Sequence, residues 1–189
     1  MREFQKELWN LPNILSIIRI VVSPVLILLL ITPDRVMGVI AAIFFLSVCF
    51  TDWLDGYIAR KRGTVTAVGK FLDPLADKVL IVTALIMLIN LGRTPAWMVA
   101  LIVSREVAVT GLRTVAARSS ISIPAGWMGK TKTVTQICAI TFLLLHYPFF
   151  GIDFHSVGMM ALWVALLATV WSGVDYFIRF FSAPAAGRV

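Results

Sequence analysis

Four aspartates in two adjacent apolar segments are the residues of this sequence best suited to carry chemistry. Asp52 and Asp55 lie three positions apart, and Asp73 and Asp77 lie four positions apart. On a helix, either spacing places both carboxylates on one face, because successive residues turn by about 100°. The connection between the segments is short and basic. We therefore expect two antiparallel, neighbouring helices whose carboxylates face each other.

Facing carboxylates require a positively charged ligand. Four clustered carboxylates repel one another and raise one another's pKa values unless a cation compensates their charge. Oxygen ligands select a hard divalent cation, with Mg²⁺ preferred and Mn²⁺ or Ca²⁺ as alternatives. Four carboxylates suit two ions that share ligands, an arrangement used for phosphoryl displacement. We predict a site for two divalent cations, Mg²⁺ or Mn²⁺, and regard four unrelated interfacial aspartates as the weaker interpretation.

Three small residues accompany the aspartates. Gly56 and Ala59 share the face of the first pair, and Gly69 shares the face of the second pair. Because they add no bulk beside the carboxylates, a flat group such as a nucleotide base could approach the backbone there. The alternative is tight helix packing through small residues, which is common in membranes, and both interpretations can hold together.

The composition of the chain indicates that its surroundings are lipid. Of its 189 residues, 59% are apolar and 14% are charged, whereas soluble domains carry about 45–50% apolar and about 25% charged residues. The mean hydropathy is +0.91, and the length suggests a single domain over residues 1–189. The net charge of +7 comes mostly from basic residues that flank apolar runs. We therefore expect membrane lipids, and no nucleic acid, as partners.

Six apolar segments are long enough to cross a bilayer as helices. They span residues 13–31, 36–59, 71–91, 95–112, 133–150 and 154–181. If they alternate in direction, the basic residues gather on one side, and the other side keeps only Arg35 and Arg93. The positive-inside rule then places both termini in the cytoplasm. We predict an all-α, multi-pass protein of the cytoplasmic membrane with six transmembrane helices, preceded by a short amphipathic interfacial helix over residues 1–10.

Two further pairs of charged residues lie inside or beside these segments. Asp175 and Arg179 are four positions apart, which lets them neutralise each other on one helix, so we expect a structural ion pair. Arg105 and Glu106 are adjacent and project about 100° apart, so we expect them to pair poorly with each other. They need partners on other helices or in a water-filled cavity, and such intramembrane charges indicate function.

The aspartates are part of a longer pattern that resembles a known signature. It reads Asp52-x-x-Asp55-Gly56-x-x-Ala59-Arg60, eight residues, then Gly69-x-x-x-Asp73-x-x-x-Asp77. Every fixed position and both gaps are similar to those of the CDP-alcohol phosphatidyltransferases. The resemblance implies six transmembrane helices, a homodimer, two divalent ions, and transfer of a phosphatidyl group from a CDP-lipid to an alcohol with release of CMP.

By the same resemblance, each position of the signature receives a role. Asp52, Asp55 and Asp73 would chiefly bind metal, and Asp77 would be both a metal ligand and the general base. The residues implied to bind the CDP-lipid are Asp52, Asp55, Gly56, Ala59, Arg60, Gly69 and Asp73. The active site would then lie on the second and third helices and at the cytoplasmic ends of the fourth and fifth.

The acceptor alcohol must be inferred from other segments. Three stretches resemble segments of the phosphatidylglycerophosphate synthases within this family, namely Pro12-Asn13-Ile-Leu-Ser16-Ile-Ile-Arg19, Arg105-Glu-Val-Ala-Val-Thr-Gly-Leu-Arg113 and Gly129-Lys130-Thr131-Lys132-Thr133. A phosphorylated acceptor needs cations that an unphosphorylated alcohol does not. The candidates to bind its phosphate are Arg105, Arg113, Lys130 and Lys132. The alternative is that these residues anchor the protein to lipid headgroups.

The leading hypothesis is therefore transfer from CDP-diacylglycerol to sn-glycerol 3-phosphate, which gives phosphatidylglycerophosphate and CMP. The same chemistry with inositol phosphate, or with phosphatidylglycerol to make cardiolipin, is the first alternative. A cation-coupled transporter is the second, because buried carboxylates can bind a transported cation. The position of the carboxylates near one membrane face, and a sequence with no visible inverted repeat, weigh against the transporter.

Overall fold

Six helices make up almost all of the described chain, one for each predicted apolar segment. The structure is a computed structural model, and it describes residues 11–62, 67–118, 127–149 and 151–182. The helices are α2 (Leu11–Leu29), α3 (Arg35–Arg62), α4 (Ala67–Asn90), α5 (Ala96–Arg118), α6 (Trp127–Leu145) and α7 (Phe154–Ser182). A short antiparallel pair, β1 (Pro148–Phe149) and β2 (Ile152–Asp153), joins α6 to α7. The interfacial helix predicted over residues 1–10 lies outside the described residues.

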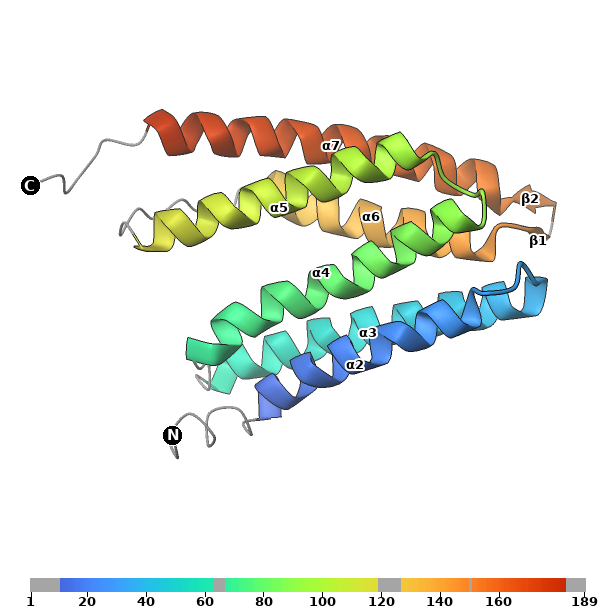
Figure 1. The fold of residues 1–189 in the computed structure, drawn as a ribbon, viewed down its shortest axis with the longest axis horizontal. Helices are drawn as coiled ribbons and strands as arrows, with labels where there is room; N and C mark the ends of the chain where they lie inside the picture. The colour runs from blue at the N-terminus through green and yellow to red at the C-terminus, as the bar shows by residue number, and fades with distance from the viewer. Residues whose placement is uncertain (1–10, 63–66, 119–126, 150, 183–189) are drawn as a thin grey trace, which may run out of the picture.

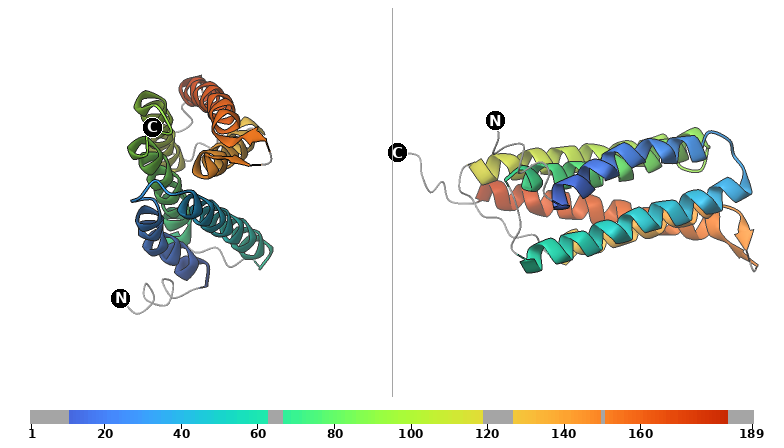
Figure 2. Two further views of the ribbon diagram at one scale, coloured as in Figure 1. Left: turned by 90° about the vertical axis from the view of Figure 1, so that its right-hand side faces the viewer. Right: turned by 90° about the horizontal axis from the view of Figure 1, so that it is seen from below.

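The helices run along the long axis of an elongated bundle (Figure 1 and Figure 2). Helix α2 packs against both α3 and α4, while α7 packs against α5 and, most extensively, against α6. The two groups meet where α6 contacts α3 and α4, and where α4 contacts α5. The last turns of α3 and the first turns of α4 lie at the same end of the bundle (Figure 1). We call this the signature end, because it holds the segment from Asp52 to Asp77.

The fifth predicted segment extends beyond the end of the helix that it corresponds to. The segment expected over residues 133–150 corresponds to α6, which begins at Trp127 and ends at Leu145. His146 follows with a φ of 55°, a left-handed conformation that commonly ends helices. Pro148 then has no N–H with which to continue a helix. The chain therefore turns through β1 and β2 before α7 begins.

The bundle is apolar both inside and outside. Its core draws on every helix and includes Leu26, Leu30, Ala41, Phe45, Leu80, Leu85, Leu88, Met98, Ile102, Ile140, Leu143, Leu144 and Leu162. Large apolar side chains are also exposed on the outer faces, among them Val21, Leu28, Phe50, Trp53, Leu167, Trp171 and Phe181. Among the described residues, Arg35–Leu54 and Phe154–Ser182 are long and apolar enough to cross a membrane. This architecture is consistent with an all-α membrane protein.

The two arginines expected on the other side of the membrane both bind main-chain carbonyls away from the signature end. Arg93 is 3% exposed and donates from Nη1 to the carbonyl oxygens of Leu144 at 2.8 Å and Leu143 at 3.2 Å. Carbonyls in the last turn of a helix have no partner within it, so Arg93 caps α6. Arg35 donates from Nη2 to the carbonyl of Pro148 at 2.9 Å. Both contacts fasten the turn after α6 to the rest of the bundle.

Candidate active site

The aspartates of the signature occupy two antiparallel helices at the signature end. Asp52 and Asp55 lie in α3, and Asp73 and Asp77 lie in α4. Helix α2 packs against both of these helices and forms one wall beside them. Of the four carboxylates, only that of Asp52 is among the described side chains. The expectation that the two helices are direct neighbours is not confirmed, because in the described residues α3 and α4 each pack against α2 but hardly against each other. Whether the two pairs of carboxylates face each other stays a prediction.

The structure also describes some, but not all, of the other predicted site residues. Gly56 lies half-buried in α3, and Gly69 lies in the first turns of α4. The side chains of Ala59 and Arg60, and that of Lys130 in α6, lie outside the described residues. Within the described part of the chain, no three acidic, histidine or cysteine side chains come close enough to hold a metal ion.

Asp52 contacts a buried arginine from α2. Arg19 Nη2 forms an ion pair with Asp52 Oδ1, with the side chains 6% and 30% exposed, respectively. The carbonyl of Arg19 accepts a hydrogen bond at 2.8 Å from Ser23 Oγ, one turn further along α2. A buried charge is costly unless it is paired, so this contact fixes the position of Asp52 relative to α2. Arg19 was visible in the sequence as a charge inside an apolar segment, and the structure supplies its partner.

A second polar group lies between α4, α5, α6 and α7, and Glu106 of α5 is at its centre. Lys132 Nζ, from α6, forms an ion pair with Glu106 Oε1. Arg105 Nη1 donates to the same oxygen at 3.1 Å. The side chains of Arg105 and Glu106 are each 14% exposed and that of Lys132 is 8% exposed. These contacts are therefore little screened by solvent.

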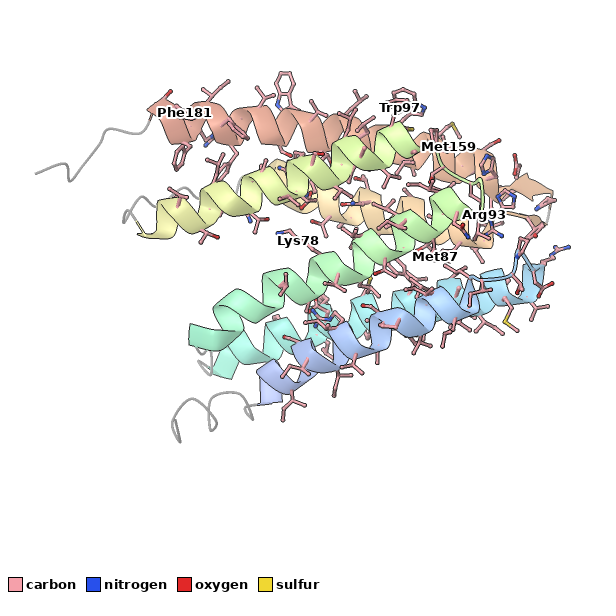
Figure 3. All side chains as sticks on the ribbon, viewed as in Figure 1. Lys78, Met87, Arg93, Trp97, Met159 and Phe181 are labelled. Atoms are coloured by element: carbon pink, nitrogen blue, oxygen red, sulfur yellow. The ribbon has the colours of Figure 1, made fainter. Side chains whose placement is uncertain are left out.

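Lys78 of α4 brings a third cation to this group. Its Nζ contacts the hydroxyl of Thr110, which in turn donates to the main-chain carbonyl of Glu106 at 2.6 Å. Figure 3 shows Lys78 extending from α4 toward α5 and α6. Lys78 directly follows Asp77 in the chain, so it links this group to the aspartates of the signature. We call Lys78, Arg105, Glu106 and Lys132 the cationic cluster.

The cationic cluster gathers basic side chains from three helices. Its described members are three cations, from α4, α5 and α6, and one carboxylate. Cationic donors form the stronger hydrogen bonds to anionic oxygens, so such a group can bind a phosphate. A phosphate monoester carries close to two negative charges at pH 7, because its second pKa is near 6.

One expectation about this cluster is wrong, and another is confirmed. Arg105 and Glu106 were expected to pair poorly with each other, yet their side chains are hydrogen-bonded at 3.1 Å. The three methylenes of Arg105 let the guanidinium reach back to its neighbour although the two Cβ atoms diverge. The expectation of partners on other helices is confirmed, since Lys132 lies on α6 and Ser172 on α7, where its Oγ lies 2.8 Å from Arg105 Nη2.

Arg113, the remaining predicted cation on α5, lies two turns beyond Arg105. Its guanidinium carbon lies 5.5 Å from the centre of the Tyr176 ring of α7, within the range of a cation–π interaction. Arg113 is exposed, so it can contact a ligand at the signature end. The ion pair predicted within α7 is confirmed, with Arg179 Nε 2.9 Å from Asp175 Oδ1.

Comparison with known proteins identifies the family. The family model for CDP-alcohol phosphatidyltransferases matches residues 9–171. The chain belongs to the CDP-alcohol phosphatidyltransferase family. A CDP-diacylglycerol--glycerol-3-phosphate 3-phosphatidyltransferase from Bacillus subtilis is 44% identical, over 91% of this chain and 95% of its own length. A protein of the same name from Rickettsia typhi is 40% identical, over 89% of this chain and 95% of its own.

A third relative carries a related name. It is a probable phosphatidylglycerophosphate synthase from Mycobacterium tuberculosis, 42% identical over 90% of this chain and 81% of its own length. The chain is thus a phosphatidyltransferase, and its match to the family covers every residue of the signature. The cationic cluster lies within the matched region together with the signature. The resemblance identified from the sequence is confirmed.

Several residues that contact or lie close to the predicted acceptor-binding residues could not be selected from the sequence. Lys78 was visible only as a charge beside Asp77, and Ser172 and Tyr176 lie in a final helix that offered no motif. Only their positions in the folded structure reveal them. Lys78 is 32 positions from its partner Thr110 in the sequence, and Ser172 is 67 positions from its partner Arg105. The only indication in the sequence was that Lys78 and Ser172 are polar residues inside apolar segments.

Proposed function

We propose that this phosphatidyltransferase transfers the phosphatidyl group of CDP-diacylglycerol to sn-glycerol 3-phosphate, producing phosphatidylglycerophosphate and CMP. The donor follows from the signature and the family. The acceptor is supported by the names of the relatives from Bacillus subtilis and Rickettsia typhi. The observation that carries the proposal is the cationic cluster, in which basic side chains from α4, α5 and α6 lie together and can donate to the phosphate of an acceptor.

The acceptor's phosphate would bind among the cations of α4, α5 and α6. Lys132 and Arg105 are held side by side by the same oxygen of Glu106. Arg113 would approach from the exposed end of α5, and Lys130 from the start of α6. Charged donors form the stronger hydrogen bonds to phosphate oxygens. The first turn of a helix also favours an anion, which supports a role for Lys130, the fourth residue of α6.

Asp77 would act as the general base of the displacement. It takes the proton from the primary hydroxyl of glycerol 3-phosphate. The hydroxyl oxygen forms a bond to the β-phosphorus of CDP-diacylglycerol, and the bond from that phosphorus to the oxygen shared with CMP breaks. CMP leaves with the electron pair of that bond. No covalent enzyme intermediate is needed, and Lys78 beside Asp77 would keep the acceptor's phosphate within reach of the base.

Two divalent cations, Mg²⁺ or Mn²⁺, would be held by Asp52, Asp55, Asp73 and Asp77. The donor set fits, since it consists entirely of carboxylate oxygens from two helices at one end of the bundle. When bound, the ions would neutralise charge on the diphosphate and on the departing CMP. Gly56, Ala59 and Gly69 would leave room for the cytidine, and Arg60 would lie near the diphosphate.

An acceptor panel tests the proposal. Purified protein is incubated with CDP-diacylglycerol and Mg²⁺, and CMP release is measured with glycerol 3-phosphate, inositol phosphate, serine or phosphatidylglycerol. We expect release with glycerol 3-phosphate, loss of release on chelation with EDTA, and recovery with Mg²⁺ or Mn²⁺. Release with another acceptor alone would show that the acceptor assignment is wrong. Unchanged release after chelation would contradict the metal site.

We also propose the membrane arrangement that the sequence predicts. Six helices would cross the cytoplasmic membrane as one domain over residues 1–189, with both termini and the active site in the cytoplasm and residues 1–10 on the membrane surface. The apolar exterior supports a lipid environment, and a homodimer is expected from the family. Single cysteines on the signature end and in the β1–β2 turn should differ in labelling by an impermeant thiol reagent. Light scattering in detergent would report the oligomeric state.

A further inference from the structure

Helix α7, to which the sequence assigns no role, packs closely against the side chain of Arg105. Gly173 is buried at the point where this side chain crosses α7. A Cβ at position 173 would lie 3.0 Å from Arg105 Cγ and 3.2 Å from Arg105 Nε. These distances are shorter than ordinary van der Waals contact, so a larger residue would force Arg105 to shift. Arg105 therefore has its present position because residue 173 has no side chain.

Ser172 holds the other end of the same side chain. Its hydroxyl donates to the carbonyl of Ala168 at 2.6 Å, which leaves its oxygen free to accept. Arg105 Nη2 donates to that oxygen at 2.8 Å, while Nη1 of the same guanidinium donates to Glu106 at 3.1 Å. Two fixed acceptors on two helices determine the plane of the guanidinium. A planar group held by two acceptors in this way has a defined orientation.

The next turn of α7 repeats the arrangement with the second arginine of α5. Tyr176 is 7% exposed, and its ring lies below the guanidinium of Arg113 at 5.5 Å. Positions 172, 173 and 176 share one face of the helix. That face contacts both arginines that were expected to bind the acceptor's phosphate.

We propose that Ser172 and Gly173 are positioning residues, which set the orientation of Arg105 for the phosphate of the acceptor. This inference rests on the proposed function, because it assumes that Arg105 binds that phosphate. It gives α7 a role in acceptor affinity that is separate from its packing against α6. An enzyme in which Arg105 has shifted would bind the CDP-lipid normally and the acceptor weakly.

The test compares Ser172→Ala and Gly173→Ala with two reference variants. Ser172→Thr keeps the hydroxyl, and Thr169→Val changes a fully buried residue one turn earlier in α7. We expect the KM for glycerol 3-phosphate to rise about tenfold in Ser172→Ala and Gly173→Ala, as for loss of one charge-assisted hydrogen bond. The kcat, and the KM for CDP-diacylglycerol, should change little. Ser172→Thr and Thr169→Val should keep the KM of the unmodified protein.

A double-mutant cycle with Arg105→Ala separates positioning from general packing. If Ser172 and Gly173 act through Arg105, then neither substitution raises the KM further once Arg105 is absent. Equal effects in both backgrounds, or a lowered melting temperature with an unchanged KM, would overturn the inference. Ser172→Ala only removes an atom, so it keeps the test valid should Gly173→Ala fail to fold. Failure of the unmodified protein to use glycerol 3-phosphate would instead overturn the proposed function.

Discussion

Lys132 of α6 forms an ion pair with Glu106 of α5, across 26 positions of the chain, and both side chains are largely buried. Arg105 shares the same carboxylate. One acidic side chain thus holds two of the four cations that the sequence proposes for the acceptor's phosphate. This arrangement lets the cations stay buried in the bundle before a substrate arrives.

Replacement of Glu106 by Gln should make stability depend on an anionic ligand. Gln keeps the shape but loses the charge, which leaves Lys132 and Arg105 buried without their shared carboxylate. Breaking a buried ion pair costs about 3–5 kcal/mol, so the free energy of unfolding should fall. Glycerol 3-phosphate should raise the melting temperature of the variant more than that of the unmodified protein. A variant as stable as the unmodified protein without ligand would contradict this account of the cluster.

Replacement of Lys78 by Met should weaken acceptor binding, although the sequence alone did not select this residue for the acceptor. Met fills a similar volume without the charge. We expect the KM for glycerol 3-phosphate to rise about tenfold, with little change in the KM for CDP-diacylglycerol. Arg179→Met is the matched control, because Arg179 pairs with Asp175 on the exposed face of α7. Because Lys78 follows Asp77, the Mg²⁺ dependence should be measured too, and a change confined to it would place Lys78 with the metal site instead.

Replacement of Asp77 by Asn should separate catalysis from donor binding. An amide cannot take the proton from the acceptor hydroxyl, and general-base catalysis contributes about a hundredfold to ten-thousandfold. CMP release should fall by about that factor, while binding of CDP-diacylglycerol, followed by calorimetry in detergent, remains measurable. Asp175→Asn provides the control, since this aspartate forms the ion pair within α7. Near-normal release in Asp77→Asn would assign the base to another residue.

Asp153, in β2 just before α7, should make part of the stability depend on pH. The Ser156 hydroxyl donates to its carboxylate at 2.6 Å and the main-chain N–H of His155 donates at 3.1 Å. These hydrogen bonds, Ser156 first, hold the pKa of Asp153 below its usual value. A lowered pKa in the folded state means that the carboxylate stabilises the protein above the unfolded pKa of about 3.9. That contribution is lost as the pH falls through the folded pKa.

The measurement is the melting temperature of Asp153→Ala against pH. The variant should melt below the unmodified protein at pH 6, because it lacks the cap at the start of α7. The difference should narrow as the pH falls below about 4. A difference that is constant down to pH 3 would show that the cap does not depend on the charge of Asp153.

The sequence by itself determined the helices and, through the aspartate signature, the family. Long apolar runs between prolines and basic residues predict helices, because an apolar backbone in lipid must form its hydrogen bonds internally. The pair Asp175–Arg179 and the spacing of the aspartates are also local, since residues four positions apart meet on one helix whatever surrounds it. The end of α6 was less predictable, because an apolar run does not show where His146 adopts a positive φ.

The tertiary structure alone decided which helix faces meet and which charges share a site. Nothing local indicates that Arg105 lies over Gly173 or that Lys78 reaches Thr110, since each contact depends on how two helices rotate and pack. Adjacent residues were judged from their Cβ directions, so the bond between Arg105 and Glu106 was missed, although a long side chain can bend to reach its neighbour. Spacing fixes the face of one helix, whereas a polar cluster built from four helices exists only once they have packed together.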